Sequence, residues 1–233
     1  MGKYLQYLKY VLEHKKNVFK ICWRKGDYIH AFTHDLSKFT LGEFIPYARW
    51  FCGEYGVNYQ NNPTSKENSL IKHYKLKKEF EEAWEHHQLR NKHHWNYWTY
   101  DIDKYYNSPF VGVGDCKLKT PRDMPVKYIK QMISDWEAMS MNFNDVPQRF
   151  YLENYHKIEL SRETRLCLEW NLGLIQLLNA SFSEGNWEVW SPMGETFKEY
   201  SKTEYGEHLL KNVLFKNIDE KYGVNTYKLL SKN

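Results

Sequence analysis

Two adjacent residues, His34 and Asp35, carry the strongest chemical signal in the sequence. They stand in the segment THDLSK, which we expect to form part of a mostly apolar helix. An imidazole and a carboxylate are both good ligands for zinc, manganese, iron or nickel, so this pair can bind one metal ion together. The pair also fits a simpler interpretation, in which Asp35 forms an ion pair with Lys38 three residues later on the helix.

A second signal is the segment from Trp84 to Trp95, which contains four histidines within nine residues. On a continuous helix its polar residues form two trios, each on one face: His86, Arg90 and His93, and beside them His87, Asn91 and His94. Either trio could face a metal ion and an anion together, because histidine is a common metal ligand. A histidine-rich face exposed to solvent is the alternative.

Two more residues could complete a shell of ligands. His14 lies in an amphipathic segment, and Asp135 lies among apolar residues. A buried carboxylate needs a metal ion, an arginine or hydrogen-bond donors. The alternative for Asp135 is an ion pair with a surface cation such as Lys127 or Lys130.

The spacing of apolar residues predicts that helices position all of these candidates. We expect helices over residues 4–22, 28–39, 43–55, 70–100, 124–141, 161–178 and 207–215. Polar, glycine-rich and proline-rich segments at 56–69 and 103–125 predict loops, and residues 181–194 predict a small hairpin. The fold class is therefore all-α, with one helical domain over residues 1–150 and a C-terminal extension, in part helical and in part irregular, over residues 151–233.

The composition is that of a packed globular chain. Of 233 residues, 17% are aromatic, and a formal net charge of +4 is spread over alternating lysine and glutamate, which does not favour a nucleic-acid partner. Four cysteines stand singly, which is typical of reduced thiols. The N-terminal segment lacks the apolar core of a signal peptide, and no stretch approaches the roughly 20 apolar residues of a membrane span, so we expect a cytoplasmic protein.

The order of the candidate residues along the chain resembles the HD-domain superfamily of metal-dependent phosphohydrolases, which includes nucleotidases and cyclic-nucleotide phosphodiesterases. The resemblance covers about residues 4–141. The segments HDLSKF, FIPYARWF and HHQLRNKHHWNYW look still closer to an uncharacterised family of phage and bacterial proteins, a domain of unknown function with an HD-like pattern. The implied fold is an HD-like helical bundle.

The resemblance implies that His14, His34, Asp35 and Asp135 bind one divalent metal ion, with Asp35 at the catalytic centre. Manganese, iron, zinc, cobalt and nickel all suit such ligands. We expect one metal ion, and a second one is left open.

Superfamily members with two metal ions use additional histidines for the second. His87 and His94 suit that role here, with His86 and His93 as alternatives. Those members usually draw the histidines from separate elements, whereas here they come from a single segment. The histidines could bind substrate phosphate instead.

The implied reaction is hydrolysis of a nucleotide or a related phosphoester by metal-activated water. Lys38, Arg90 and Lys92 would bind the phosphate and neutralise its developing charge. His86 or His93 would protonate the leaving group.

The expected partner is therefore a small phosphorylated substrate, a nucleotide by preference, with no membrane involved. An interface for a homo-oligomer is a hypothesis for the C-terminal extension. Two other functions stay open: a di-iron oxygenase of the HD fold, and a non-catalytic protein that sequesters a nucleotide. Oxygen-dependent iron chemistry would favour the first, and tight binding without turnover would favour the second.

Overall fold

The computed structural model describes residues 2–53, 66–108, 112–143 and 145–174, with side chains described from residue 71 onward in the second range. The expectation of an all-α fold is confirmed, because the regular elements within these ranges are eight α-helices and short 3₁₀ helices. The described residues form no strand, and their one isolated β-bridge joins Tyr100 and Lys117.

The chain divides into two compact units, Met1–Leu118 and Lys119–Asn233. This division lies before the domain boundary expected at residue 150, and the domain organisation itself stays a prediction. Each unit is described by itself.

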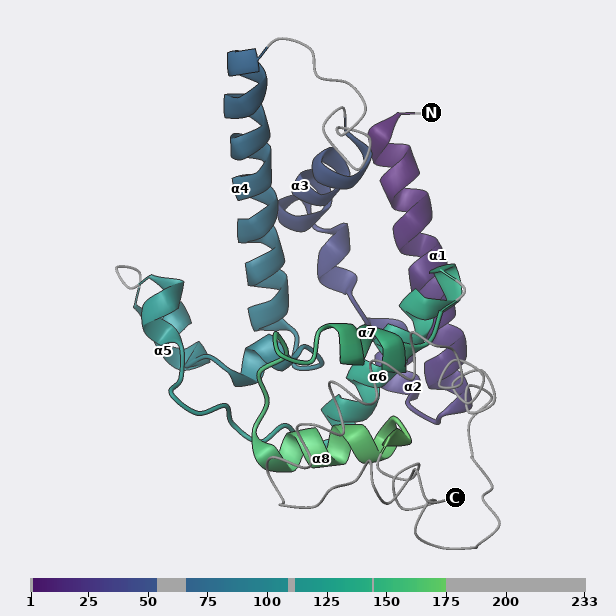
Figure 1. Cartoon of the computed structure of the whole chain (residues 1–233). Coiled ribbons are helices and arrows are strands. Elements are labelled where there is room, and N and C mark those ends of the chain that lie inside the picture. The colour runs from purple at the N-terminus through teal and green to yellow at the C-terminus, as the bar shows by residue number, and fades with distance from the viewer. Residues whose placement is uncertain (1, 54–65, 109–111, 144, 175–233) are drawn as a thin grey trace, which may run out of the picture. The chain divides into compact units, whose positions relative to one another are not determined.

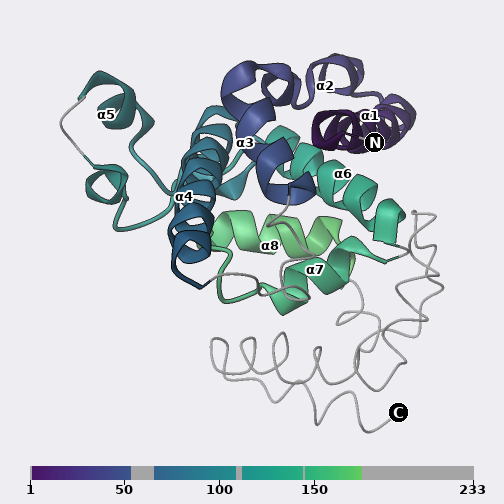
Figure 2. The same cartoon turned by 90° about the horizontal axis from the view of Figure 1, so that it is seen from above.

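The longest helices of the first unit are α1 (Lys3–Arg24), α3 (Leu41–Cys52) and α4 (Lys66–Arg90). Figures 1 and 2 show α3 between α1 and α4. Apolar side chains recur along α1 at helical spacing, and burying that stripe holds the helix in place. The core between the three helices contains Tyr7, Val11, Tyr47, Ala48 and Ala83. His14 belongs to the same buried stripe of α1, so packing fixes its position.

The prediction of one continuous helix over residues 28–39 is wrong, because the helix is interrupted at His34 and Asp35. Helix α2 ends at Thr33, His34 follows it with the non-helical angles φ −53° and ψ 126°, and the 3₁₀ helix η1 begins at Leu36. Between them Asp35 has a left-handed backbone, with φ 53° and ψ 29°. A right-handed helix cannot continue through such a residue.

The end of α2 is held by α1. Helix α2 covers Tyr28–Thr33. The Lys15 ammonium donates hydrogen bonds of 2.9 Å to the carbonyl oxygens of both Phe32 and His34. A cation at the last carbonyls of a helix satisfies acceptors that have no partner within the helix. Lys15 therefore helps to fix the backbone that carries Asp35.

The helix expected over residues 70–100 ends earlier, at Arg90. The Asn91 side chain donates a 2.8 Å hydrogen bond to the carbonyl oxygen of His87, and such local bonds compete with continuation of a helix. The chain then turns, and the 3₁₀ helix η3 covers Trp95–Trp98. His93 and His94 consequently lie in a turn and do not share helix faces with His86 and His87.

The loop expected over residues 103–125 contains short helices: α5 (Ile102–Asn107) and the 3₁₀ helix η4 (Val113–Cys116). Figures 1 and 2 show α5 on the side of α4 that faces away from α1.

The second unit contains α6 (Val126–Phe143), α7 (Pro147–Glu153) and α8 (Arg162–Asn171), with α7 and α8 each packed against α6. The cap expected at Ser161 is confirmed, because its hydroxyl accepts a 3.2 Å hydrogen bond from the Thr164 backbone. Helix α7 was not expected. The predicted hairpin at 181–194 and helix at 207–215 lie outside the described residues.

A buried polar network joins α7 and α8. The Tyr151 hydroxyl donates a 2.6 Å hydrogen bond to Glu169 and accepts one of 2.9 Å from Arg165. In the first unit, by contrast, the buried Tyr47 hydroxyl has no hydrogen-bond partner among the described residues. These two buried tyrosines form a matched pair.

We predict that Tyr151→Phe lowers the free energy of unfolding by about 1–3 kcal/mol, because it removes a donor from the buried Glu169 carboxylate. Tyr47→Phe keeps the ring contacts and removes a hydroxyl that none of the described groups binds, so stability should be unchanged or higher. Chemical denaturation of both variants tests this. An equal loss of stability in the two variants would contradict it.

Candidate metal centre

The centre of the site is the Asp35 carboxylate, which is buried among nitrogen atoms. Oxygen Oδ1 lies 3.4 Å from Nε2 of His87 and 3.4 Å from Nε2 of His93. Oxygen Oδ2 lies 3.3 Å from Nε2 of His34 and 2.5 Å from the Lys38 ammonium. The left-handed backbone, which aspartate tolerates better than most residues, is part of what places the carboxylate here.

Asp35, His87, His93 and His94 form a group that could hold a metal ion. One donor atom from each lies within 4.8 Å of the others, and all four residues are buried. The Nε2 atoms of His87 and His94 are 3.0 Å apart. Ligands about 2.0–2.1 Å from a tetrahedral ion lie about 3.3 Å from one another, so the spacing and chemistry of these donors fit a divalent metal ion. We call this group the Asp35 cluster.

The far side of His87 is held by a second carboxylate. Nδ1 of His87 lies 2.9 Å from Glu43, and the Ser37 hydroxyl donates a 2.9 Å hydrogen bond to the same Glu43 oxygen. Histidines that bind metals commonly donate their other ring N–H to a carboxylate, which fixes the ring and raises its basicity. Glu43 on α3 therefore orients His87 so that Nε2 points into the Asp35 cluster.

His34 is also surrounded on both ring nitrogens. Its Nε2 lies 3.3 Å from Nε2 of His14 as well as 3.3 Å from Asp35. Its Nδ1 lies 3.3 Å from Nε2 of His30. His30 lies within α2 and His34 is the C-cap residue one turn later, so the last turn of the short helix brings these two imidazoles together.

Opposing influences act on the pKa of Asp35. Burial alone would raise it, because the charged form loses water. The charges of His34, Lys38 and His87 outweigh burial and hold the pKa of this carboxyl well below its ordinary value. Asp35 is thus ionised and suited to bind a cation.

His87 has the opposite behaviour. Burial would lower its pKa, but the Asp35 charge, together with hydrogen bonds that His87 donates to the Asp35 and Glu43 carboxylates, raises the pKa above its ordinary value. For Glu43, burial is likewise outweighed, chiefly by the hydrogen bond with His87, so the pKa of Glu43 is lowered. The imidazole is therefore a strong base between two carboxylates.

The structure brings together many of the expected ligands. Asp35 lies with His87 and His94, and His14 lies against His34. His93, expected as an alternative ligand or as an acid, belongs to the Asp35 cluster. The roles of these residues as ligands stay predictions.

Asp135 is buried on α6 in the second unit, and its place among the ligands also stays a prediction. His86 lies 3.5 Å from Glu43 and does not belong to the Asp35 cluster. Arg90 is exposed, and the Lys92 ammonium is exposed and lies 5.8 Å from the centre of the Tyr97 ring. Binding of phosphate by these two cations remains a sequence-based expectation.

Three residues of the site were missed: His30, Ser37 and Glu43. His30 could have been found, because it precedes His34 by one helical turn in an apolar segment. Glu43 gave no signal, since one glutamate at the start of a helix is ordinary. Only tertiary packing of α3 against α4 brings it to His87.

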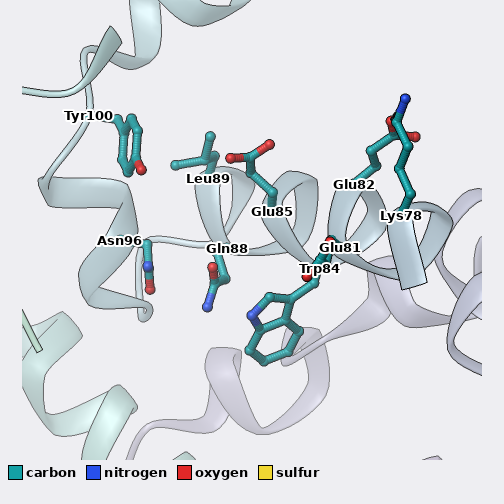
Figure 3. A pocket seen from close by; sticks show the side chains of 9 residues that line it. All are labelled: Lys78, Glu81, Glu82, Trp84, Glu85, Gln88, Leu89, Asn96 and Tyr100. Carbon is teal, nitrogen blue, oxygen red and sulfur yellow. Dashed lines mark ion pairs between the residues drawn. The ribbon is translucent and has the colours of Figure 1, made fainter. Parts of the chain in front are cut away.

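Figure 3 shows a separate hollow along α4, with a volume of about 330 Å³. Its lining includes Trp84, Glu85 and Gln88 of α4 and Asn96 and Tyr100 of the segment that follows. It contains no residue of the Asp35 cluster. The centre of the Trp84 ring nevertheless lies 6.0 Å from that of the His87 ring, and the two rings are stacked, so this tryptophan packs against a residue of the Asp35 cluster.

Residues 3–173 match a family of unknown function, DUF5662, and the chain belongs to that family. No curated protein and no solved structure matches the chain. Within the residues that the structure describes, no helix is long and apolar enough to cross a membrane. The match confirms the expectation that the chain belongs to an uncharacterised family, because the function of this family is unknown.

We predict that His87→Ala weakens binding of Zn²⁺ to the metal-free chain by at least about 100-fold, because it removes a donor whose orientation is fixed from behind. His86→Ala should change the affinity by less than about tenfold, because its contact is with Glu43. Isothermal titration calorimetry with Zn²⁺ measures both. Equal losses from the two neighbouring histidines would contradict the assignment.

A second prediction concerns pH. Because the pKa of His87 is raised, protonated His87 stabilises the metal-free fold below its ordinary pKa of about 6.5, and this contribution is lost as pH rises through the raised pKa. A metal ion needs the deprotonated ring, so its stabilisation grows over the same interval. The increase in Tm caused by Zn²⁺ should be larger at about pH 8 than at about pH 6. An increase that does not depend on pH would count against ligation by His87.

Proposed function

We propose that this member of the DUF5662 family is a metal-dependent phosphohydrolase of the HD type. The observation that carries the proposal is the Asp35 cluster, in which one carboxylate and three imidazoles are buried with the spacing of metal ligands. The chain order of His14, His34-Asp35 and the later histidines, which resembles that superfamily, supports the same conclusion.

The donor set suits a divalent transition metal. Imidazole ligands favour zinc, iron, cobalt or nickel, and the carboxylate admits manganese. A metal ion held here would supply Lewis acidity, polarising a phosphoryl oxygen and lowering the pKa of the water that it binds.

The residues around the ion would do the rest. Glu43 keeps Nε2 of His87 directed at the Asp35 cluster through Nδ1. Asp35 supplies a fixed negative charge at its centre. These protein groups are already ordered, so little reorganisation energy is needed when charge develops in the transition state.

Lys38 is the cation best placed to meet a phosphate. Its ammonium lies 2.5 Å from the buried Asp35 carboxylate, while its side chain remains 15% exposed. An ammonium at the boundary between a buried anionic site and solvent can bind the oxygens of an incoming phosphate. Lys38 thus orients substrate in this proposal, and a nucleotide remains the expected substrate.

We predict that the metal-free chain does not hydrolyse phosphate esters and that added Mn²⁺, Co²⁺, Ni²⁺ or Zn²⁺ restores turnover. Asp35→Asn should lower kcat/KM by at least about 100-fold, because it removes the charge and a donor atom from the Asp35 cluster. Asp103→Asn is the matched control, since Asp103 is exposed on α5. Release of p-nitrophenol from mono- and diester substrates, and of phosphate from nucleotides, measures the effect.

Three results would contradict the proposal. Hydrolysis that persists in a folded Asp35→Asn chain would remove the Asp35 cluster from the reaction. Tight nucleotide binding by metal-loaded protein without turnover would indicate sequestration. Consumption of oxygen by the iron-loaded protein, without hydrolysis under anaerobic conditions, would indicate an oxygenase.

A further inference from the structure

A second group of imidazoles lies beside the Asp35 cluster and shares His93 with it. It consists of His30, His34 and His93, whose donor atoms lie within 4.8 Å of one another. All three residues are buried. His30 and His34 come from α2 and its end, and His93 comes from the turn after α4.

The contacts within this group are close but are poor hydrogen bonds. Nδ1 of His34 and Nε2 of His30 are 3.3 Å apart. Hydrogen bonds donated by N–H are usually about 2.7–3.2 Å long, whereas two ligands of one tetrahedral ion lie about 3.3 Å apart. The ring centres of His30 and His34 lie 5.2 Å and 4.8 Å from that of His93. One donor nitrogen of each of the three rings therefore lies within 4.8 Å of the other two.

Burial makes this convergence informative. Imidazoles in contact with solvent could lie together by chance, but His30 is 7% exposed, His34 is 1% exposed and His93 is 5% exposed. Each ring nitrogen carries either a proton or a lone pair, and buried polar atoms need complementary partners. One cation can accept a lone pair from each of the three rings, since a neutral imidazole nitrogen is a common metal ligand.

We propose that His30, His34 and His93 form a second metal position, selective for ions that prefer nitrogen ligands. The set contains three imidazoles and no carboxylate, a donor set that suits zinc, copper or nickel and suits manganese poorly. The Asp35 cluster includes a carboxylate and accepts manganese as well. The two positions therefore differ in chemistry.

His93 couples the two positions, because it belongs to both groups. One ring nitrogen gives its lone pair to one ion at a time, so ions in the two positions compete for this ring. Binding of two ions is therefore unequal, with the second weaker than the first. The inference rests on the metal-binding part of the proposed function and not on its reaction.

The test is the number of metal ions bound by the full-length chain after removal of metal with a chelator. Equilibrium dialysis followed by elemental analysis should give two Zn²⁺ per chain, bound in two separable steps, and one Mn²⁺ per chain. His30 belongs only to the second position, so His30→Ala and the bulkier His30→Gln should each bind one Zn²⁺. His94→Ala removes a ligand that belongs only to the Asp35 cluster, and it should retain the weaker step.

His156→Ala is the matched control, because His156 is an exposed histidine of the second unit, and it should still bind two Zn²⁺. Circular dichroism checks that each variant keeps its helical content. One Zn²⁺ in the unaltered chain, or two in both His30 variants, would overturn the inference. A His30 variant that only weakens a single site would show that His30 orients His34 instead of binding metal.

Failure of this inference can be distinguished from failure of the proposed function. One bound Zn²⁺ with metal-dependent phosphoester hydrolysis overturns the second position alone. Two bound Zn²⁺ without hydrolysis supports the second position and overturns the reaction.

Discussion

The buried charge of Asp35 is the constraint on which the first unit depends. An ionised carboxylate removed from water is costly unless nearby groups compensate it. His34 and Lys38 do so from the segment around Asp35 itself, and His87 does so from α4. Packing of α3 against both α1 and α4 brings these segments to one point, while Lys15 on α1 fixes the backbone immediately before Asp35.

An ion-pair network without a metal is the competing explanation for these contacts. A single cation would balance Asp35, and Lys38 lies close enough to do so. The network contains more groups than are needed to neutralise the Asp35 charge, since donor atoms of three buried imidazoles lie within 4.8 Å of the carboxylate. Glu43 behind His87 fits both explanations, because a second carboxylate stabilises a protonated imidazole and also orients an imidazole that acts as a ligand.

Sequence periodicity predicted the helices that pack along their whole length, and it failed where local backbone chemistry decides the structure. Helix α1 and the cap at Ser161 followed from their residues. The break at Asp35 did not, because a left-handed aspartate has no distinct apolar pattern. The end of α4 depends on the hydrogen bond from the Asn91 side chain, which competes with a pattern that otherwise favours continuation.

The candidate site was predictable in its residue types and less so in its geometry. His34, Asp35 and the later histidines stand out by type, yet the expectation that the histidines share helix faces is wrong because α4 ends at Arg90. The turn after α4 is what allows His93 and His94 to approach Asp35 and His87 together. Glu43 illustrates the limit, because only the packing of three helices gives this residue its role.

The most direct measurement is anomalous diffraction at the zinc edge from crystals of the zinc-loaded chain. A metal site at the Asp35 cluster predicts a strong peak about 2.0–2.2 Å from an Asp35 oxygen and from Nε2 of His87 and His94. A zinc-loaded crystal with no peak beside Asp35, in which Lys38 alone balances that carboxylate, would contradict the account.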